Sequence, residues 1–340
     1  MKAYGIGGQS GLDGLHLVEA QEPVAGPGEI VVRVAAAGLN YRDLMVLRGQ
    51  YGAAQPATRV PLSDGVGVIE ALGEAVTGFA IGDRVLAPHF INWIAQPFSM
   101  ALFGQDMGVT ADGWLAEKVK LPAAAAIKLP ETVSDDTAAT LAVVGGTVWH
   151  AMIAFGQVQP GELVLAQGTG GVAIFALQLA KAMGAQFAIT SSSDAKIDKC
   201  RALGADYTVN YRTHPDWPAA LMEATGGRGA DVVVDTLGFP AFAQTVQATS
   251  VNGRIGTLGA LSGSPQDSAT GSQGLIIAKN ITIKGIASGS RAMLSAALDV
   301  IASDGIEMLV DREFRFDDAP AAFAHLDSGA HMGKVLIRVG

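Results

Sequence analysis

The stretch Leu163-Val164-Leu165-Ala166-Gln167-Gly168-Thr169-Gly170-Gly171-Val172-Ala173 decides the fold expected for this chain. An apolar strand pattern leads into G-x-G-x-x-A spacing, and a helical pattern follows. The first glycine permits a tight turn, the second lets the backbone approach a pyrophosphate, and the alanine lets helix and strand pack closely. The free N–H groups at the helix N-terminus then attract the phosphates. We therefore predict a dinucleotide-binding loop with the cofactor contacts Gly168, Thr169, Gly170, Gly171 and Val172.

Strands and helices alternate around and after this loop. Strands are expected at residues 162–166, 186–190, 207–209, 231–235, 254–258 and 281–286. Helices are expected at residues 172–183, 195–203, 216–224 and 240–249. Such alternation predicts βαβ units and a parallel sheet. The loop stands at the first strand–helix turn of the series, which favours a nucleotide site over a glycine-rich turn without a ligand.

The two ends of the chain have a different pattern. Residues 1–120 are mostly β in character, with apolar strand runs at residues 30–35, 66–72 and 84–87. Residues 89–113 are irregular and aromatic, which predicts a long surface loop. Ser134 is expected to cap a helix. A further helix and a last strand are expected at residues 292–302 and 334–339.

Length and composition limit the possible classes of protein. At about 100–200 residues per domain, 340 residues suggest two domains. Hydrophobic residues make up 49% of the chain and charged residues 16%, so the chain can bury large cores and is not disordered. The net charge is −9 and no basic block exists, which argues against nucleic acid as a partner. A small-molecule substrate is expected instead.

The single cysteine and the absence of long apolar segments bear on the cellular compartment expected for this protein. Cys200 alone excludes a disulfide framework and a multi-cysteine zinc site, and an ordinary buried or half-buried thiol is expected. Residues 1–8 lack the apolar stretch of a signal peptide, and no apolar run reaches the ~18 residues of a membrane span. These features predict a soluble, cytoplasmic protein with no membrane partner.

The end of the second strand in the series bears on the choice of cofactor. An NAD site has Asp or Glu there to bind the ribose hydroxyls, whereas this strand ends in Ser191, Ser192 and Ser193. Lys196 follows in the next helix, and Tyr211 follows the third strand. Hydroxyls and a lysine suit a 2′-phosphate, which a carboxylate would repel. These residues favour NADP(H) over NAD(H), although the same serines would also cap the helix.

A set of segments carries a resemblance that runs from end to end of the chain. They are residues 38–43 (GLNYRD), 61–73 (PLSDGVGVIEALG), 78–85 (GFAIGDRV), 146–149 (GTVW), 167–173, 203–206 (LGAD), 231–238 (DVVVDTLG) and 333–335 (GKV). With these segments the chain resembles a medium-chain dehydrogenase/reductase, and more closely the zinc-independent, quinone-oxidoreductase-like branch of that superfamily. The segments are specific for the superfamily and say little about the substrate.

The resemblance implies an α/β protein with two domains. A GroES-like, β-rich catalytic domain would comprise residues 1–124 and 290–340. A Rossmann domain with a doubly wound parallel sheet, residues 125–289, would bind NADP(H), with a cofactor cleft between the two. A homodimer or homotetramer is also implied, because residues 281–286 match the strand through which such dimers often extend their sheets.

Zinc alcohol dehydrogenases of the same superfamily provide an informative contrast. They carry a metal-binding Cys after the third strand, a His at the start of the G-x-G segment, and a later Cys or Asp before the cofactor helix. The matching segments here, residues 39–43, 62–65 and 144–147, contain neither Cys nor His. Because a catalytic zinc needs three protein ligands, we expect no metal in this protein.

The resemblance also implies catalytic candidates. Asn40 matches the position that lines the nicotinamide end, where it would bind substrate or cofactor, and a loop cap is the alternative. Tyr41 would line the pocket or belong to the core. Tyr51 matches the tyrosine with which related enoyl reductases deliver a proton, and a loop aromatic is the alternative. An apolar pocket wall, or ordinary loop packing, would be formed by Phe90, Trp93, Phe98, Phe103 and Trp114.

Further matched positions concern the cofactor and local structure. Lys334 would reach the cofactor or be solvated. Arg42 and Asp43 are expected to form a structural ion pair, and Asp64 is expected to hold local structure. The remaining cofactor contacts implied by the resemblance are Thr147, Leu237, Gly259, Ala260 and Leu261.

Three functions are compatible with these residues. The first is NADP(H)-dependent, zinc-independent hydride transfer between the nicotinamide and a quinone or a conjugated carbonyl or alkene. Without a metal, hydrogen-bond donors must stabilise the charge that develops on oxygen, and conjugated acceptors spread that charge and need less help. The second function is alcohol–carbonyl interconversion, and the third is non-catalytic binding of NADPH.

Overall fold

The computed structural model describes residues 1–259 and 272–340, which form two compact units. Unit 1 consists of Met1–Gly146 and Gly289–Gly340, and unit 2 consists of Thr147–Ser288. Both ends of the chain therefore build unit 1. The expected α/β class is confirmed, with a parallel sheet in unit 2 and a mostly antiparallel sheet in unit 1.

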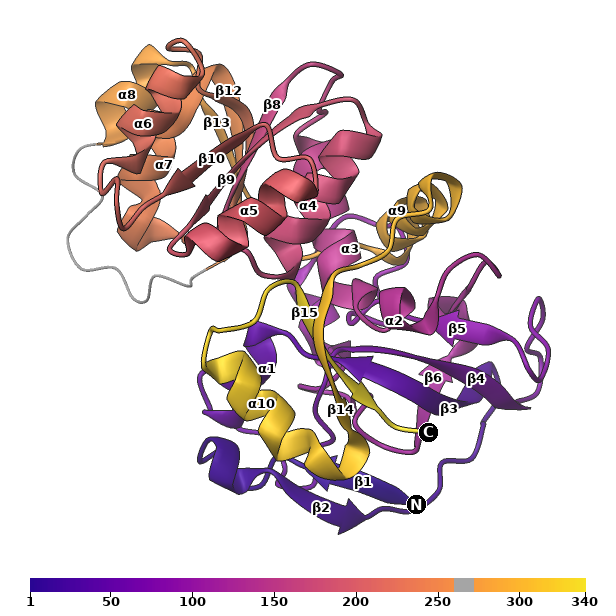
Figure 1. Ribbon diagram of the computed structural model, residues 1–340. Helices are drawn as coiled ribbons and strands as arrows, with labels where there is room; N and C mark the ends of the chain where they lie inside the picture. The colour runs from indigo at the N-terminus through magenta and orange to yellow at the C-terminus, as the bar shows by residue number, and fades with distance from the viewer. Residues whose placement is uncertain (260–271) are drawn as a thin grey trace. The chain divides into compact units, whose positions relative to one another are not determined.

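Unit 2 is built around a six-stranded parallel sheet with the strand order β10-β9-β8-β11-β12-β13. Its strands are β8 (Leu163–Gln167), β9 (Gln186–Ser191), β10 (Tyr207–Asn210), β11 (Ala230–Asp235), β12 (Thr249–Thr257) and β13 (Thr282–Gly285). Its helices are α4 (Gly171–Ala182), α5 (Asp194–Ala202), α6 (Trp217–Ala224), α7 (Phe242–Ala248) and α8 (Ser272–Ala278). Figure 1 shows α4 and α5 on one side of the sheet and α6, α7 and α8 on the other. The strand order reverses between β8 and β11, and doubly wound sheets bind ligands at such a reversal.

Burial in unit 2 follows from this topology. β8 is buried along its whole length, as expected for a central strand covered on both faces. Cys200 of α5 is fully buried, and burial raises the pKa of its thiol to about 11, so the expectation of an ordinary buried thiol is confirmed. β13 is exposed along its length at one edge of the sheet, and its role in a dimer stays a prediction.

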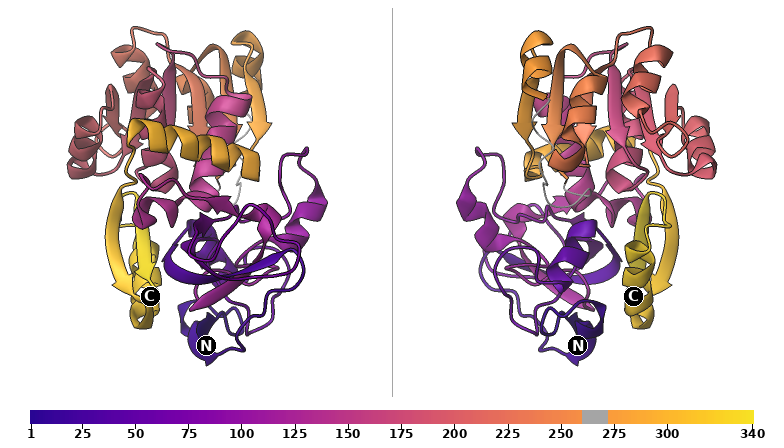
Figure 2. Two further views of the ribbon diagram at one scale, coloured as in Figure 1. Left: turned by 90° about the vertical axis from the view of Figure 1, so that its right-hand side faces the viewer. Right: turned by 90° about the vertical axis from the view of Figure 1, so that its left-hand side faces the viewer.

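Unit 1 contains a seven-stranded sheet and a separate pair of strands. The sheet has the order β14-β15-β3-β4-β5-β7, and β6 pairs with β3. The strands are β1 (Lys2–Gly5), β2 (His16–Glu19), β3 (Glu29–Gly38), β4 (Asp64–Leu72), β5 (Arg84–Leu86), β6 (Lys118–Pro122), β7 (Ile127–Lys128), β14 (Val310–Arg315) and β15 (Lys334–Arg338). The helices are α1 (Tyr41–Leu47), α2 (Asp135–Ala138), α9 (Arg291–Asp304) and α10 (Ala319–Asp327), and α3 (Leu141–Trp149) runs on into unit 2. The ribbon of α10 lies beside β14 and β15, which it contacts (Figure 2).

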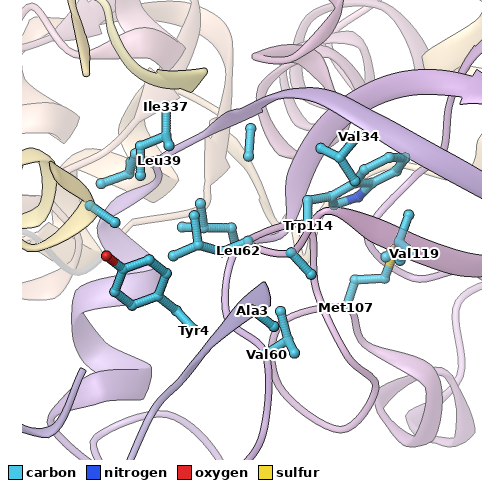
Figure 3. Packing of buried hydrophobic residues seen from close by; sticks show 14 of the residues in the cluster. Ala3, Tyr4, Val34, Leu39, Val60, Leu62, Met107, Trp114, Val119 and Ile337 are labelled. Carbon is cyan, nitrogen blue, oxygen red and sulfur yellow. The ribbon is translucent and has the colours of Figure 1, made fainter. Parts of the chain in front are cut away.

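The core of unit 1 joins distant parts of the chain. Leu39 follows β3, Leu62 precedes β4 and Ile337 lies in β15, and all three side chains are buried in one cluster with Trp114 (Figure 3). The indole of Trp114 lies so close to Gly65 that a Cβ there would be 2.3 Å from the ring. Only glycine therefore allows this contact between the start of β4 and the core.

The register of the sheet places three polar residues at one edge. Gly38, the last residue of β3, pairs with Asp64, the first residue of β4. Gly38 also pairs with Leu336 of β15, which begins at Lys334. Asn40 comes two residues after the end of β3, at the N-cap position of α1. The ends of three strands thus converge on Asn40, Asp64 and Lys334.

The boundary between the units lies later than the expected one after residue 124. Residues after it remain attached to unit 1, because β7 pairs with β5 and Val143 N donates to Asp64 Oδ1 at 2.8 Å. Ser134 caps α2 as predicted, and its hydroxyl also bonds Glu307 at 2.7 Å. Within the described residues, no helix combines the length and apolar character that a bilayer crossing requires.

Candidate active site

The loop that is predicted to bind phosphate lies between β8 and α4 of unit 2. Gly168 has φ +76°, a left-handed conformation that favours glycine. Its N–H donates to the Thr190 carbonyl oxygen at 2.9 Å, which ties the loop to β9. Gly170 is the N-cap residue of α4 and supplies no side-chain cap. Apart from chain neighbours, no described atom lies within 4 Å of where a Cβ of Gly168 or Gly170 would begin. This open, uncapped helix N-terminus fits a dinucleotide pyrophosphate.

The other predicted loop contacts lie in the same place. Thr169 is buried, and Gly171 and Val172 form the first turn of α4. Gln167, for which no role was predicted, joins the two strands at the reversal. Its Nε2 donates to Thr245 Oγ1 at 3.0 Å, and its Oε1 accepts from Thr236 N at 3.2 Å. An amide side chain at the end of an apolar strand was the signal that could have indicated this role.

The structure brings together the serines expected to select the cofactor. Ser193 Oγ accepts from Lys196 N at 3.4 Å and so caps α5, which is the alternative role foreseen for it. Ser191 Oγ accepts from Ser193 N at 3.2 Å. Tyr211 N donates to the Ser191 carbonyl oxygen at 3.0 Å, and the tyrosine side chain is exposed. Ser192 is half-buried in the same turn. The paired ends of β9 and β10 therefore bring the serines and Tyr211 to the same edge of the sheet.

Two charged residues at this turn were given no role from the sequence. Asp194 Oδ1 accepts from Asn210 Nδ2 at 2.7 Å, which holds a carboxylate at the start of α5. Arg212 follows Tyr211 and is exposed, and its backbone N donates to Asn210 Oδ1 at 3.0 Å. Arg212 thus adds a cation near the end of β10 that would favour a phosphate, whereas the carboxylate of Asp194 would disfavour one.

The remaining cofactor candidates of unit 2 fall at its strand ends and in α3. Gly259 N donates to the Asp235 carbonyl oxygen at 3.3 Å, and a Cβ at Gly259 would be 2.0 Å from the Thr236 carbonyl oxygen. Leu237 is half-buried in the turn after β11. Thr147 is buried, with its Oγ1 3.4 Å from Ser288 Oγ. The other two candidates, Ala260 and Leu261, lie outside the described residues.

The catalytic candidate Asn40 belongs to a buried polar cluster in unit 1. Its Oδ1 accepts from Lys334 Nζ at 2.7 Å, and its backbone N donates to Asp43 Oδ2 at 2.7 Å. Lys334 Nζ also pairs with Asp64 Oδ2 at 2.9 Å, and Ser63 Oγ lies 3.2 Å from Asp43 Oδ1. The side chain of Lys334 is 3% exposed, so the solvated alternative is wrong for it. The expectation that Asp64 holds local structure is consistent with its two bonds, to Lys334 and to the backbone N–H of Val143.

Arg42 does not pair with Asp43, so the expected ion pair is wrong. The guanidinium of Arg42 instead pairs with Asp106 at 2.6 Å, and His89 Nδ1 lies 2.8 Å from the same carboxylate. Adjacent residues of a helix do not face each other, and Asp106 reaches Arg42 from the loop after β5. Tyr51 covers this pair, with its ring centroid 4.7 Å from Arg42 Cζ.

Burial and charge set the ionisation of these groups in opposite directions. Burial is the main cause that raises the pKa of Asp43 to about 6, and it also raises the pKa of the Tyr51 hydroxyl. Burial alone would raise the pKa of Asp106, but Arg42 and His89 outweigh it and hold that pKa below its usual value. Burial, followed by the charge of Arg42, lowers the pKa of His89. The hydroxyl of Tyr51 is therefore protonated at neutral pH and able to donate.

The aromatic candidates mostly pack among themselves. Phe90 and Trp93 are buried with ring centroids 6.2 Å apart, and Phe103 packs edge-on against Phe90. Phe98 is 38% exposed, and Trp114 belongs to the core of unit 1. The loop between β5 and β6 is thus partly buried rather than wholly on the surface. The remaining catalytic candidate, Tyr41, is 45% exposed, so its core alternative is wrong.

The residues at the segments matched to zinc ligands do not fit a zinc ion. Asp64 uses one oxygen for the Val143 N–H and the other for Lys334, and Asn40 Oδ1 also accepts from Lys334. An ammonium thus already occupies the acceptors that a metal would need. In the part of the chain that the structure describes, no three His, Cys, Asp or Glu side chains are grouped to hold a metal ion.

Comparisons with known proteins agree with this architecture. The alcohol dehydrogenase GroES-like domain family matches residues 26–131, and the zinc-binding dehydrogenase family matches residues 171–303. A zinc-type alcohol dehydrogenase-like protein of Schizosaccharomyces pombe is 37% identical over 97% of this chain and 96% of its own length. The acryloyl-coenzyme A reductase of Sulfurisphaera tokodaii is 30% identical over 99% of this chain and 100% of its own. A solved quinone oxidoreductase of Pseudomonas syringae is 27% identical with a TM-score of 0.82, over 99% of both chains.

We predict that Gly168→Ala weakens NADPH binding by roughly tenfold. A Cβ in the left-handed region costs about 1–2 kcal/mol, and a loop that relaxes to avoid this strain no longer presents its N–H groups. Gly184→Ala is the matched control, because Gly184 has φ +72° just beyond the other end of α4, ~18 Å along the helix. Fluorescence titration of NADPH measures both affinities. An equal loss in the two variants would contradict the assignment of the loop.

Proposed function

The chain belongs to the medium-chain dehydrogenase/reductase superfamily and is an NAD(P)H-dependent oxidoreductase, and on this premise we propose that it transfers hydride between NADP(H) and a quinone or a conjugated carbonyl or alkene. We further propose that it does so without a catalytic zinc. The observation that carries the proposal is the buried ammonium of Lys334, which binds Asn40 and Asp64 within two of the segments that match the zinc-ligand segments of zinc enzymes. The names of the reductase and the quinone oxidoreductase relatives denote a conjugated alkene and a quinone.

A conjugated acceptor suits the groups of unit 1. Hydride transfer to a carbonyl or quinone places negative charge on oxygen, and hydrogen-bond donors must stabilise it when no Lewis acid does. The candidates are the amide of Asn40 and the protonated hydroxyl of Tyr51. Both are neutral donors, which stabilise a delocalised enolate or hydroquinone anion more easily than a localised alkoxide.

The bound cofactor supplies the hydride, and residues of this chain hold its phosphates and stabilise the acceptor. The N-terminus of α4 binds the pyrophosphate, while Ser191, Lys196 and Arg212 bind the 2′-phosphate. Asn40 donates a hydrogen bond to the oxygen of the substrate that accepts the hydride. Tyr51 gives its hydroxyl proton to the reduced product, and burial keeps that proton in place until charge develops beside it.

Alcohol–carbonyl interconversion is the second candidate. The name of the Schizosaccharomyces pombe relative favours it. The two candidates differ in the charge that the site must stabilise, because a saturated carbonyl forms a localised alkoxide. A panel of quinones, enones and simple alcohols separates them.

We predict that NADPH binds at least tenfold more tightly than NADH, since a charge-assisted contact to phosphate contributes about 1.5–3 kcal/mol. Lys196→Ala should remove most of this preference by weakening NADPH alone. Lys199→Ala is the matched control, because Lys199 lies in the last turn of the same helix α5. Titration of both cofactors by fluorescence tests the prediction. Equal affinities in the unmodified protein would show that the serine turn does not select NADP(H).

We predict that chelator-washed protein contains well under one zinc ion per chain and keeps its activity. The acceptor oxygens of Asn40 and Asp64 are already bound to Lys334, so a metal finds no free ligand there. Elemental analysis combined with kinetics before and after chelation measures both properties. A stoichiometric zinc ion whose removal abolishes activity and whose return restores it would overturn the zinc-independent mechanism.

We predict that Tyr51→Phe lowers kcat on an enone by roughly 10²-fold, the effect of losing a general acid, and has a smaller effect on a quinone, which can take its proton from water. KM should change less than kcat, because the contact forms mainly in the transition state. Tyr4→Phe is the matched control: Tyr4 is also in unit 1, and its hydroxyl donates only to the Asp317 carbonyl oxygen, at 3.2 Å. Steady-state kinetics that show full activity for Tyr51→Phe on the best substrate would exclude this role.

A further inference from the structure

The amide nitrogen of Asn40 is a buried hydrogen-bond donor without a partner among the described residues. The side chain as a whole is 9% exposed, and Nδ2 itself has no acceptor. An unsatisfied buried donor is unfavourable in a folded protein, and such groups call for an explanation. Its oxygen, in contrast, is bound to Lys334 at 2.7 Å. The oxygen of the amide thus has a hydrogen-bond partner, whereas its nitrogen has none among the described residues.

Lys334 determines which end of the amide remains unsatisfied. An ammonium carries three donors and no acceptor. If the amide were turned over, its N–H groups would face those of Lys334 at hydrogen-bonding distance, and the bond would be replaced by repulsion. The oxygen must therefore point to Lys334, and Nδ2 must point away from it.

The lysine is itself held in a fixed position. Its ammonium pairs with Asp64 Oδ2 at 2.9 Å, and the other oxygen of Asp64 accepts from Val143 N at 2.8 Å. The backbone of Asn40 is fixed separately, through the bond from its N–H to Asp43 Oδ2. A chain of bonds thus runs from the backbone of α3 through Asp64 and Lys334 to the oxygen of Asn40.

We propose that Lys334 and Asp64 are positioning residues that lock the Asn40 amide so that Nδ2 donates to the carbonyl oxygen of the acceptor substrate. The proposal rests on the proposed function for the identity of that substrate. The ammonium also withdraws electron density from the amide, which strengthens Nδ2–H as a donor. Because Nδ2 has no acceptor among the described residues, a substrate oxygen that binds there displaces no protein partner.

The kinetic test uses a double variant that keeps the buried charge balanced and a single variant that removes the donor. Lys334→Met together with Asp64→Asn removes both charges and retains an acceptor for the Val143 N–H. Asn40→Asp retains an acceptor for Lys334 and removes the donor. With 2-cyclohexen-1-one and NADPH as probes, each should lower kcat by the order of 10²-fold, as for the loss of an oxyanion donor. The affinity for NADPH should stay unchanged, and Lys118→Met, whose ammonium joins Glu22 and Glu70 on the same unit, should keep full kcat.

Combining the three substitutions tells a positioning role from a merely structural one. If Lys334 acts through Asn40, the triple variant should be no slower than Asn40→Asp alone. Losses that multiply would show that Lys334 acts independently of the amide, and this outcome would overturn the proposal. An unchanged kcat in Lys334→Met with Asp64→Asn would overturn it as well.

A spectroscopic measurement separates this inference from the proposed function. In the ¹⁵N-labelled full chain, the Asn40 side-chain resonances are identified by their loss in Asn40→Asp. Adding 2-cyclohexen-1-one in the presence of NADP⁺, where no turnover occurs, should move one amide proton downfield in the unmodified protein and not in Lys334→Met with Asp64→Asn. A protein that reduces no probe but shows this difference would refute the proposed function alone. No shift, an equal shift in both proteins, or a shift with NADP⁺ alone would refute the inference.

Discussion

The buried ion pair of Lys334 with Asp64 is the interaction on which the geometry of unit 1 depends. Its charged atoms are 2.9 Å apart, and the side chains are 3% and 0% exposed. The partners are 270 positions apart in the chain. Breaking such a pair leaves an uncompensated buried charge and typically costs about 3–5 kcal/mol. The start of β4 is therefore electrostatically complete only when β15 has been added to β3, so the catalytic candidates in the first part of the chain require its last strand.

The two units stabilise charge by different means. Unit 2 offers backbone N–H groups at the N-terminus of α4, which attract an anion without burying a formal charge. Unit 1 buries several formal charges, and their pKa values depend on whether a cation touches them. Asp43, which no guanidinium contacts, has its pKa raised to about 6 mainly by burial, whereas Asp106 has a lowered pKa because Arg42 and His89 outweigh burial. The predicted cofactor loop therefore depends on the shape of its backbone, whereas the cluster of unit 1 depends on the balance of its charges.

Local patterns in the sequence predicted the cofactor loop. Ion pairs between residues that are far apart in the chain could not be predicted from such patterns. The spacing of Gly168, Gly170 and Ala173 acts through neighbours in the chain, so the turn and the helix start could be placed correctly. The sequence did not decide whether Lys334 contacts the cofactor or is solvated, because its partners lie 270 and 294 positions away in the chain. The expected pair of Arg42 and Asp43 was wrong, since neighbours on a helix point apart and the true partner comes from a distant loop. Sequence proximity is thus a poor guide to ion pairs at the start of a helix.

The unsatisfied amide of Asn40 connects the stability of unit 1 with its function. Leaving Nδ2 without an acceptor costs about 1–3 kcal/mol in the free protein. The Lys334–Asp64 pair makes this cost unavoidable, because the amide cannot turn to relieve it without losing a charge-assisted bond of 2.7 Å. A substrate oxygen that accepts from Nδ2 would recover this energy on binding, and recover more as charge grows on the oxygen. The free energy of the unsatisfied donor, which the neighbouring ion pair maintains, would then favour the transition state over the ground state, which is the condition for an interaction to accelerate a reaction.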